Sequence, residues 1–98
     1  MTASVITNLV PDYDEMLLGA TPYKLEIKGE PEPRVRVTEL MDLETGTKTV
    51  RIIAKASEGV PALALSTLDA IARRILPNAR VKATGKGTAG MHREYAAS

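Results

Sequence analysis

The fold is decided by residues 60–76, which read VPALALSTLDAIARRIL. At 100° per residue the apolar side chains of this stretch share one side of a helix, and Asp69 and Arg73 lie opposite. Pro61 suits a first helical turn, and Pro77 stops the helix by disfavouring helical geometry at the residue before it. The sequence therefore predicts one long amphipathic helix over 60–76, whose apolar side must pack on another layer.

Stretches with strand periodicity lie on both sides of this helix. Apolar and polar residues alternate in four stretches, which are 23–28, 34–43, 48–56 and 79–84. Segments rich in Gly and Pro lie between them. We predict an α+β fold in which a three-stranded antiparallel meander is followed by the long helix and a short fourth strand. This is a ββαβ-type two-layer sandwich with an N-terminal arm or short helix.

A chain of 98 residues has room for one hydrophobic core. We expect residues 23–84 to form an α+β core domain. Residues 1–22 are apolar and then acidic, and we predict an N-terminal arm or short helix there. Residues 85–98 start with several glycines, and we predict a flexible, glycine-rich basic tail.

The composition excludes several classes of protein. The chain contains no Cys, which removes disulfides, thiolate metal sites and cysteine nucleophiles. No segment approaches the roughly 20 apolar residues of a membrane span, and the N-terminus lacks the pattern of a signal peptide. We therefore expect a cytoplasmic protein, or a component of a virion if the chain is encoded by a virus.

Charge is distributed unevenly along the chain. Residues 1–44 contain nine acidic and four basic residues, whereas residues 45–98 contain nine basic and three acidic residues. Such asymmetry indicates a polyanionic partner for the basic half, subunits that dock acidic face to basic face, or two surfaces that neutralise each other within one fold.

Two features of the sequence could indicate a catalytic or cofactor site, but neither is accompanied by the other residues that such a site needs. Residues 85–90, GKGTAG, match G-x-G-x-x-G, but the helix, second strand and acidic residue of a dinucleotide site do not follow. His92 is the sole histidine, and Glu94 alone cannot complete a metal site with it. We predict no catalytic, cofactor or metal site, no small-molecule substrate, and no enzymatic activity.

Six basic residues lie close together in the second half of the sequence and could contact phosphates. These candidate polyanion contacts are Arg73, Arg74, Arg80, Lys82, Lys86 and Arg93. The predicted order of elements resembles that of double-stranded RNA-binding domains, whose last helix begins with phosphate-binding lysines. Val60, Pro61 and Ala62 occupy those positions here, so the resemblance covers topology and does not extend to the activity.

The first hypothesis is therefore a non-enzymatic assembly or protein-interaction subunit, a homo-oligomer or the partner of another protein, as in a phage structural or accessory protein. Its candidate interface residues are Val5, Ile6, Leu9, Leu17, Leu40, Ile53 and Leu63. The alternatives are a nucleic-acid-binding or regulatory module that uses the basic half, and an inhibitor that covers a partner protein. We expect no membrane partner.

Overall fold

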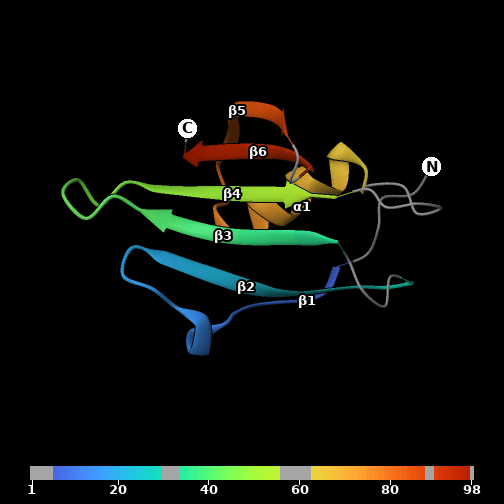
Figure 1. The fold of residues 1–98 in the computed structure, drawn as a ribbon, viewed down its shortest axis with the longest axis horizontal. Helices are drawn as coiled ribbons and strands as arrows, with labels where there is room; N and C mark the ends of the chain where they lie inside the picture. The colour runs from blue at the N-terminus through green and yellow to red at the C-terminus, as the bar shows by residue number, and fades with distance from the viewer. Residues whose placement is uncertain (1–5, 30–33, 56–62, 88–89, 98) are drawn as a thin grey trace.

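The computed structural model describes residues 6–29, 34–55, 63–87 and 90–97 (Figure 1). These residues form six strands, one α-helix and one 3₁₀ turn. In chain order they are β1 (Ile6–Pro11), η1 (Tyr13–Glu15), β2 (Ala20–Ile27), β3 (Val35–Met41), β4 (Lys48–Ala54), α1 (Leu65–Ile75), β5 (Ala79–Gly87) and β6 (Gly90–Ala97).

All six strands belong to one sheet, in the order β1-β2-β3-β4-β6-β5. Every neighbouring pair is antiparallel. Strand β6, the last in the sequence, is inserted between β4 and β5 (Figure 1). The two edges of the sheet are therefore β1 and β5.

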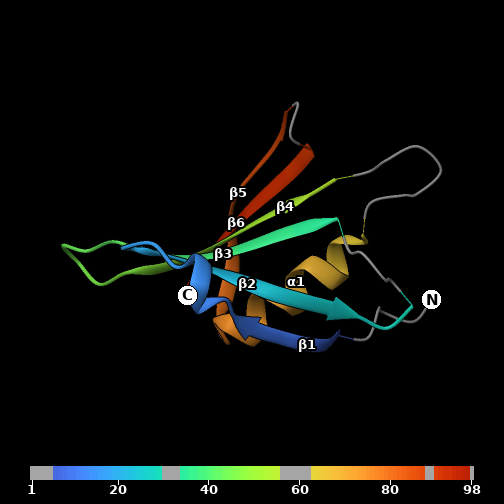
Figure 2. The same cartoon turned by 60° about the horizontal axis from the view of Figure 1, so that its bottom comes forward.

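The helix covers one face of this curved sheet, which we call the inner face; the opposite one is the outer face (Figure 2). Alternation along the strands decides which residues point inward: Val37 lies opposite Ile52 in the register and both are buried. The core is aliphatic apart from one tyrosine, and its buried residues are Val37, Val50, Ile52, Ala54, Leu68, Ile71, Ala72, Ala79 and Tyr95.

The predicted topology is wrong in its number of strands and in the length of its helix. The helix begins at Leu65 because Ala64 is extended, with ψ of 149°, and it ends at Ile75, two residues before Pro77. Positions 60–62 of the predicted helix lie outside the described residues. The sheet has six strands where four were predicted, so more than half of the described residues lie in strands.

Both ends of the sequence supply the extra strands. The predicted N-terminal arm or short helix contains β1, whose Leu9 lies opposite Leu25 of β2 and packs against the core. Among the described residues of this segment, 6–22, only Tyr13–Glu15 makes a helical turn, of the 3₁₀ type. The predicted flexible tail contains the end of β5 and all of β6. Long-range pairing, which a local pattern does not reveal, stabilises both segments.

The glycines of residues 85–90 serve this β5–β6 hairpin. Gly90 has a φ of 113°, and a Cβ there would lie 2.5 Å from the carbonyl oxygen of Ala54 on β4. A Cβ on Gly85 would lie 2.5 Å from Cε1 of His92. Glycine is therefore required where β6 approaches the backbone of β4, whereas a Cβ at Gly85 would meet only the end of the His92 side chain, which can move aside.

No helix in the described part of the chain is long and apolar enough to cross a membrane.

Candidate functional site

Two connections meet at one end of the molecule: the β1–β2 connection and the β3–β4 hairpin (Figures 1 and 2). The amide of Met41 donates a 2.9 Å hydrogen bond to the carbonyl oxygen of Gly19, and this bond joins the two connections. Leu43 lies against Gly19, since a Cβ built there would be 3.7 Å from Leu43 Cγ. The two loops thus present one continuous surface.

This surface is strongly apolar and open to solvent. Five large apolar side chains in it are at least half exposed: Leu18 (88%), Leu17 (70%), Tyr13 (70%), Leu43 (58%) and Met16 (50%). We call these five residues the apolar end. Exposed apolar patches larger than a few hundred Å² are uncommon on monomeric proteins and mark sites of interaction.

Local hydrogen bonding fixes the conformation of both loops. Leu17 and Ala20 exchange backbone hydrogen bonds of 2.9 and 3.0 Å across a tight turn with Leu18 at its tip. Gly19 supplies the positive φ, 80°, that this turn requires. In the β3–β4 hairpin, Asp42 Oδ1 accepts hydrogen bonds from the amides of Glu44 and Thr45. The exposed leucines are thus held on ordered turns.

The two edges of the sheet differ in charge. Residues 6–15, which comprise β1 and the turn after it, contain three acids and no base. Strand β5 contains three bases and no acid. Asp14, Glu15, Arg80 and Lys82 are all exposed. We call residues 6–15 the acidic edge and β5 the basic edge.

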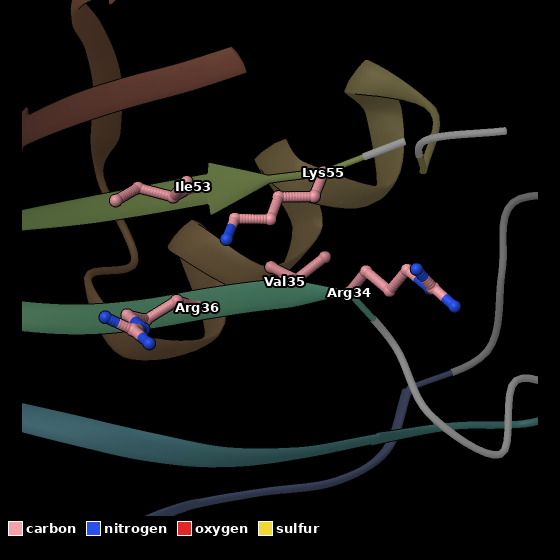
Figure 3. A pocket seen from close by; sticks show the side chains of 5 residues that line it. All are labelled: Arg34, Val35, Arg36, Ile53 and Lys55. Carbon is pink, nitrogen blue, oxygen red and sulfur yellow. The ribbon is translucent and has the colours of Figure 1, made fainter. Parts of the chain in front are cut away.

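The outer face contains a shallow hollow of about 220 Å³, lined by Arg34, Val35, Arg36, Ile53 and Lys55 (Figure 3). The side chains of Arg34 and Arg36 extend toward opposite ends of this hollow, and the Lys55 ammonium lies between them. The three cations therefore line the hollow without converging on one point.

The inner face contains a polar network beside the core. The Tyr95 hydroxyl donates a 2.7 Å hydrogen bond to Asp69 Oδ1, and the Arg93 guanidinium lies 3.4 Å from the same oxygen. Burial, followed by the contact with Asp69, raises the pKa of Tyr95 to about 12. This network joins β6 to α1.

A second ion pair lies on the outer face between β4 and β6. Nε and one terminal nitrogen of Arg51 donate hydrogen bonds of 2.9 and 2.7 Å to Glu94 Oε1. This hydrogen bonding, opposed by desolvation, lowers the pKa of Glu94. Among the described residues, no three His, Cys, Asp or Glu side chains are grouped so that they could hold a metal ion.

The predicted interface residues are scattered. Leu17 belongs to the apolar end, whereas Ile6, Leu9 and Leu63 pack against the core. Leu40 and Ile53 are half-buried on the outer face. Val5 lies outside the described residues.

The predicted polyanion contacts are also divided. Arg73 and Arg74 are exposed on α1, on the inner side of the sheet, while Arg80 and Lys82 are exposed on β5. Arg93 is turned inward, with 13% of its side chain exposed and its charge next to Asp69. Lys86 lies in β5 by its backbone. The structure therefore does not gather the six bases into one patch.

Sequence reasoning missed most of the apolar end: Tyr13, Met16, Leu18 and Leu43. A signal was present, because Leu17-Leu18-Gly19 places two leucines at a glycine turn and Leu43 adjoins the turn that contains Gly46. Large apolar residues at the tips of turns are good candidates for exposure.

Comparisons with known proteins find no relative: no family model matches, and neither a curated protein nor a solved structure is similar. The function therefore has to be argued from the surfaces of this chain.

Proposed function

We propose that this chain is a non-enzymatic assembly subunit that self-associates, and that the apolar end is its main contact. The observation that carries the proposal is the exposure of five large apolar side chains on two ordered, hydrogen-bonded turns. Because the backbone of these turns is already ordered, covering their side chains costs little backbone conformational entropy. A virion, or the cytoplasm in which a virion is assembled, is the setting we propose for such a subunit.

Burial of the exposed leucine side chains is favourable enough to drive association. Fully burying a leucine side chain is worth about 1.5–3 kcal/mol. Covering Leu17, Leu18 and Leu43 would therefore contribute on the order of 5 kcal/mol before the entropic cost of association is subtracted. Tyr13 adds an aromatic ring with a polar hydroxyl, which suits the rim of an interface.

Light scattering after size-exclusion chromatography tests this proposal. The wild-type protein should form a defined oligomer at high concentration and low salt, and the double variant Leu17→Ser/Leu18→Ser should elute as a monomer. Leu65→Ser is the matched control, since Leu65 is 46% exposed but lies on α1, and it should assemble like the wild type. A monomeric wild type, or undiminished assembly of the double variant, would contradict the proposal.

Phosphate binding on the outer face is the second candidate function. It is favoured by the three cations around the hollow, Arg34, Arg36 and Lys55. Binding of DNA or RNA should then weaken steeply with salt, and Arg36→Ala/Lys55→Ala should reduce the slope of that dependence by about 2. The absence of any mobility shift at low salt with either nucleic acid would rule this function out.

A further inference from the structure

The two edge strands of the sheet run in opposite directions. Five antiparallel neighbour pairs separate β1 from β5 in the sheet order, and each pair reverses the strand direction. Because five is odd, β5 is antiparallel to β1. An edge strand presents a row of backbone N–H and C=O groups that a further strand can pair with. Within the described residues β1 pairs only with β2, and β5 only with β6.

We infer that β5 of one copy pairs with β1 of a second copy, so that the sheet continues from chain to chain. This inference rests on the proposed self-association and adds a second contact, between the edge strands, to the one made by the apolar end. A second copy placed in the same orientation brings its β1 antiparallel to β5, which is the more stable way to extend a sheet.

Charge fits this arrangement. Antiparallel pairing places the end of β1, which leads into Asp14 and Glu15, beside the start of β5, which contains Arg80. The last turn of α1 immediately precedes β5 and adds the exposed Arg73 and Arg74 at the same end. The contact thus sets the acidic edge of one copy against the basic edge of the next.

Pairing between like edges is less favourable. Two copies of β5 would bring Arg80 and Lys82 against the same cations of the partner, and like charges opposite one another destabilise a strand pair. Two copies of β1 would leave the basic edge without a partner. Unlike edges therefore make a head-to-tail contact, which closes into a ring or continues as a filament.

Both edge strands also have features that hinder non-specific strand pairing. The register of β5 shifts between Val81 and Ala83, and that of β1 shifts between Ile6 and Asn8. Bulges and edge cations protect sheets against unselective association. A partner strand followed by acids satisfies those cations, so the same features select the complementary edge.

Charge reversal tests the inference. Arg80→Glu/Lys82→Glu and Asp14→Lys/Glu15→Lys should each weaken self-association by at least about tenfold, because each makes both edges alike in charge. An equimolar mixture of the two variants should assemble again, since each restores the complement of the other. Arg36→Glu/Lys55→Glu changes the charge equally on the outer face and should assemble like the wild type.

Cross-linking provides a second measurement that does not depend on charge variants. The chain contains no Cys, so single cysteines report on single positions. A short bismaleimide should join Val10→Cys protein to Ala83→Cys protein when the two are mixed, and should join neither variant to itself. Cross-links within one variant alone would mean that like edges meet, which overturns the inference.

The two proposals fail differently. Assembly that is lost in Leu17→Ser/Leu18→Ser but unchanged by charge reversal would overturn the edge-to-edge pairing and leave the proposed function standing. A wild type that stays monomeric would overturn both. Circular dichroism of each variant shows whether it is folded. If a charge-reversal variant does not fold, the cross-linking of Val10→Cys to Ala83→Cys decides whether the unlike edges pair.

Discussion

Tyr95 on β6 donates a 2.7 Å hydrogen bond to Asp69 on α1, and Tyr95 is only 2% exposed. The same carboxylate lies 3.4 Å from the Arg93 guanidinium, which in turn lies 5.7 Å from the centroid of the Tyr95 ring. A central strand is thereby joined to the helix by polar contacts as well as by packing.

Removing the hydroxyl of Tyr95 should lower stability measurably. Tyr95→Phe keeps the ring in the core but deprives Asp69 of a donor, and we expect the free energy of unfolding to fall by about 1–2 kcal/mol. Urea denaturation followed by circular dichroism measures the change. Tyr13→Phe is the control, because Tyr13 is 70% exposed and should lose almost nothing.

Removing the carboxylate of Asp69 should cost more. Asp69→Ala leaves both the Tyr95 hydroxyl and the mostly buried Arg93 without their partner, so we expect a loss of about 2–4 kcal/mol. The same denaturation experiment checks this. A loss smaller than that of Tyr95→Phe would show that Arg93 gains nothing from Asp69.

Stability should decline at alkaline pH. Burial is the main cause that raises the pKa of both Tyr23 and Tyr95 to about 12, from 10.0. Below pH 10 both tyrosines are neutral in either state; between about pH 10 and 12 the unfolded chain ionises first, which favours unfolding. We expect Tyr95 alone to account for up to about 2 kcal/mol of the loss by pH 12.

Denaturation at pH 9, 10 and 11 measures this dependence, and absorbance at 295 nm follows the ionisation of the tyrosines. Tyr95→Phe should flatten the decline. An equally steep decline in that variant would show that Tyr95 does not contribute to it.

Gly90 should be far less replaceable than Gly46. Both have positive φ, but only a Cβ at Gly90 meets backbone, at 2.5 Å, whereas one at Gly46 meets nothing within 4 Å. Gly46→Ala should therefore cost about 1 kcal/mol, from its backbone conformation alone. Gly90→Ala should cost more than about 2 kcal/mol. Thermal unfolding of the two variants compares them, and equal melting temperatures would contradict the close approach of β6 to β4.

The outer ion pair should make a small, acid-sensitive contribution. The hydrogen bonds from Arg51 lower the pKa of Glu94, so its stabilisation is present above the ordinary pKa, 4.5, and is lost as pH falls through the lowered value. Glu94→Gln should lose no more than about 1 kcal/mol at pH 7, because Arg51 is half exposed. Its stability should also fall less than that of the wild type between pH 5 and 3. Glu44→Gln, in the exposed hairpin turn, is the control and should follow the wild type.

The middle of the sheet could be predicted from the sequence. Stretches 23–28, 34–43 and 48–56 correspond to β2, β3 and β4, because their inner residues are mostly apolar and their outer residues mostly polar, with Leu40 and Ile53 as apolar exceptions on the outer face. The helix could be predicted from its apolar side, although its described residues, Leu65–Ile75, are fewer than 60–76.

Strand β6 could not be predicted in this way. Its inward positions are Met91, Arg93 and Tyr95, and the charge at Arg93 breaks the alternation that indicates a strand. The inward charge of Arg93 is tolerated because it pairs with Asp69 of α1, 24 positions earlier in the chain. This pairing is a tertiary contact, so the local pattern does not reveal it. Strand β1 was missed for a similar reason, since Leu9 is stabilised by pairing opposite Leu25.

The candidate site was predicted only in part. Leu17 was singled out because the N-terminal segment is too apolar to stay exposed without a partner. Leu18 and Leu43 join it through the backbone hydrogen bond between Met41 and Gly19, a contact that no periodicity encodes. Their clustering is therefore a product of the sheet register.

The insertion of β6 between β4 and β5 also affects biosynthesis. Arg51 and Glu94, which face each other across β4 and β6, are 43 positions apart. While a ribosome is still translating the codons for 90–97, β4 has no neighbour on that side, and the aliphatic Val50 and Ile52 lack the ring of Tyr95. Closure of the sheet therefore has to wait until 90–97 have been made, and until then the side of β4 that later receives β6 remains an open sheet edge.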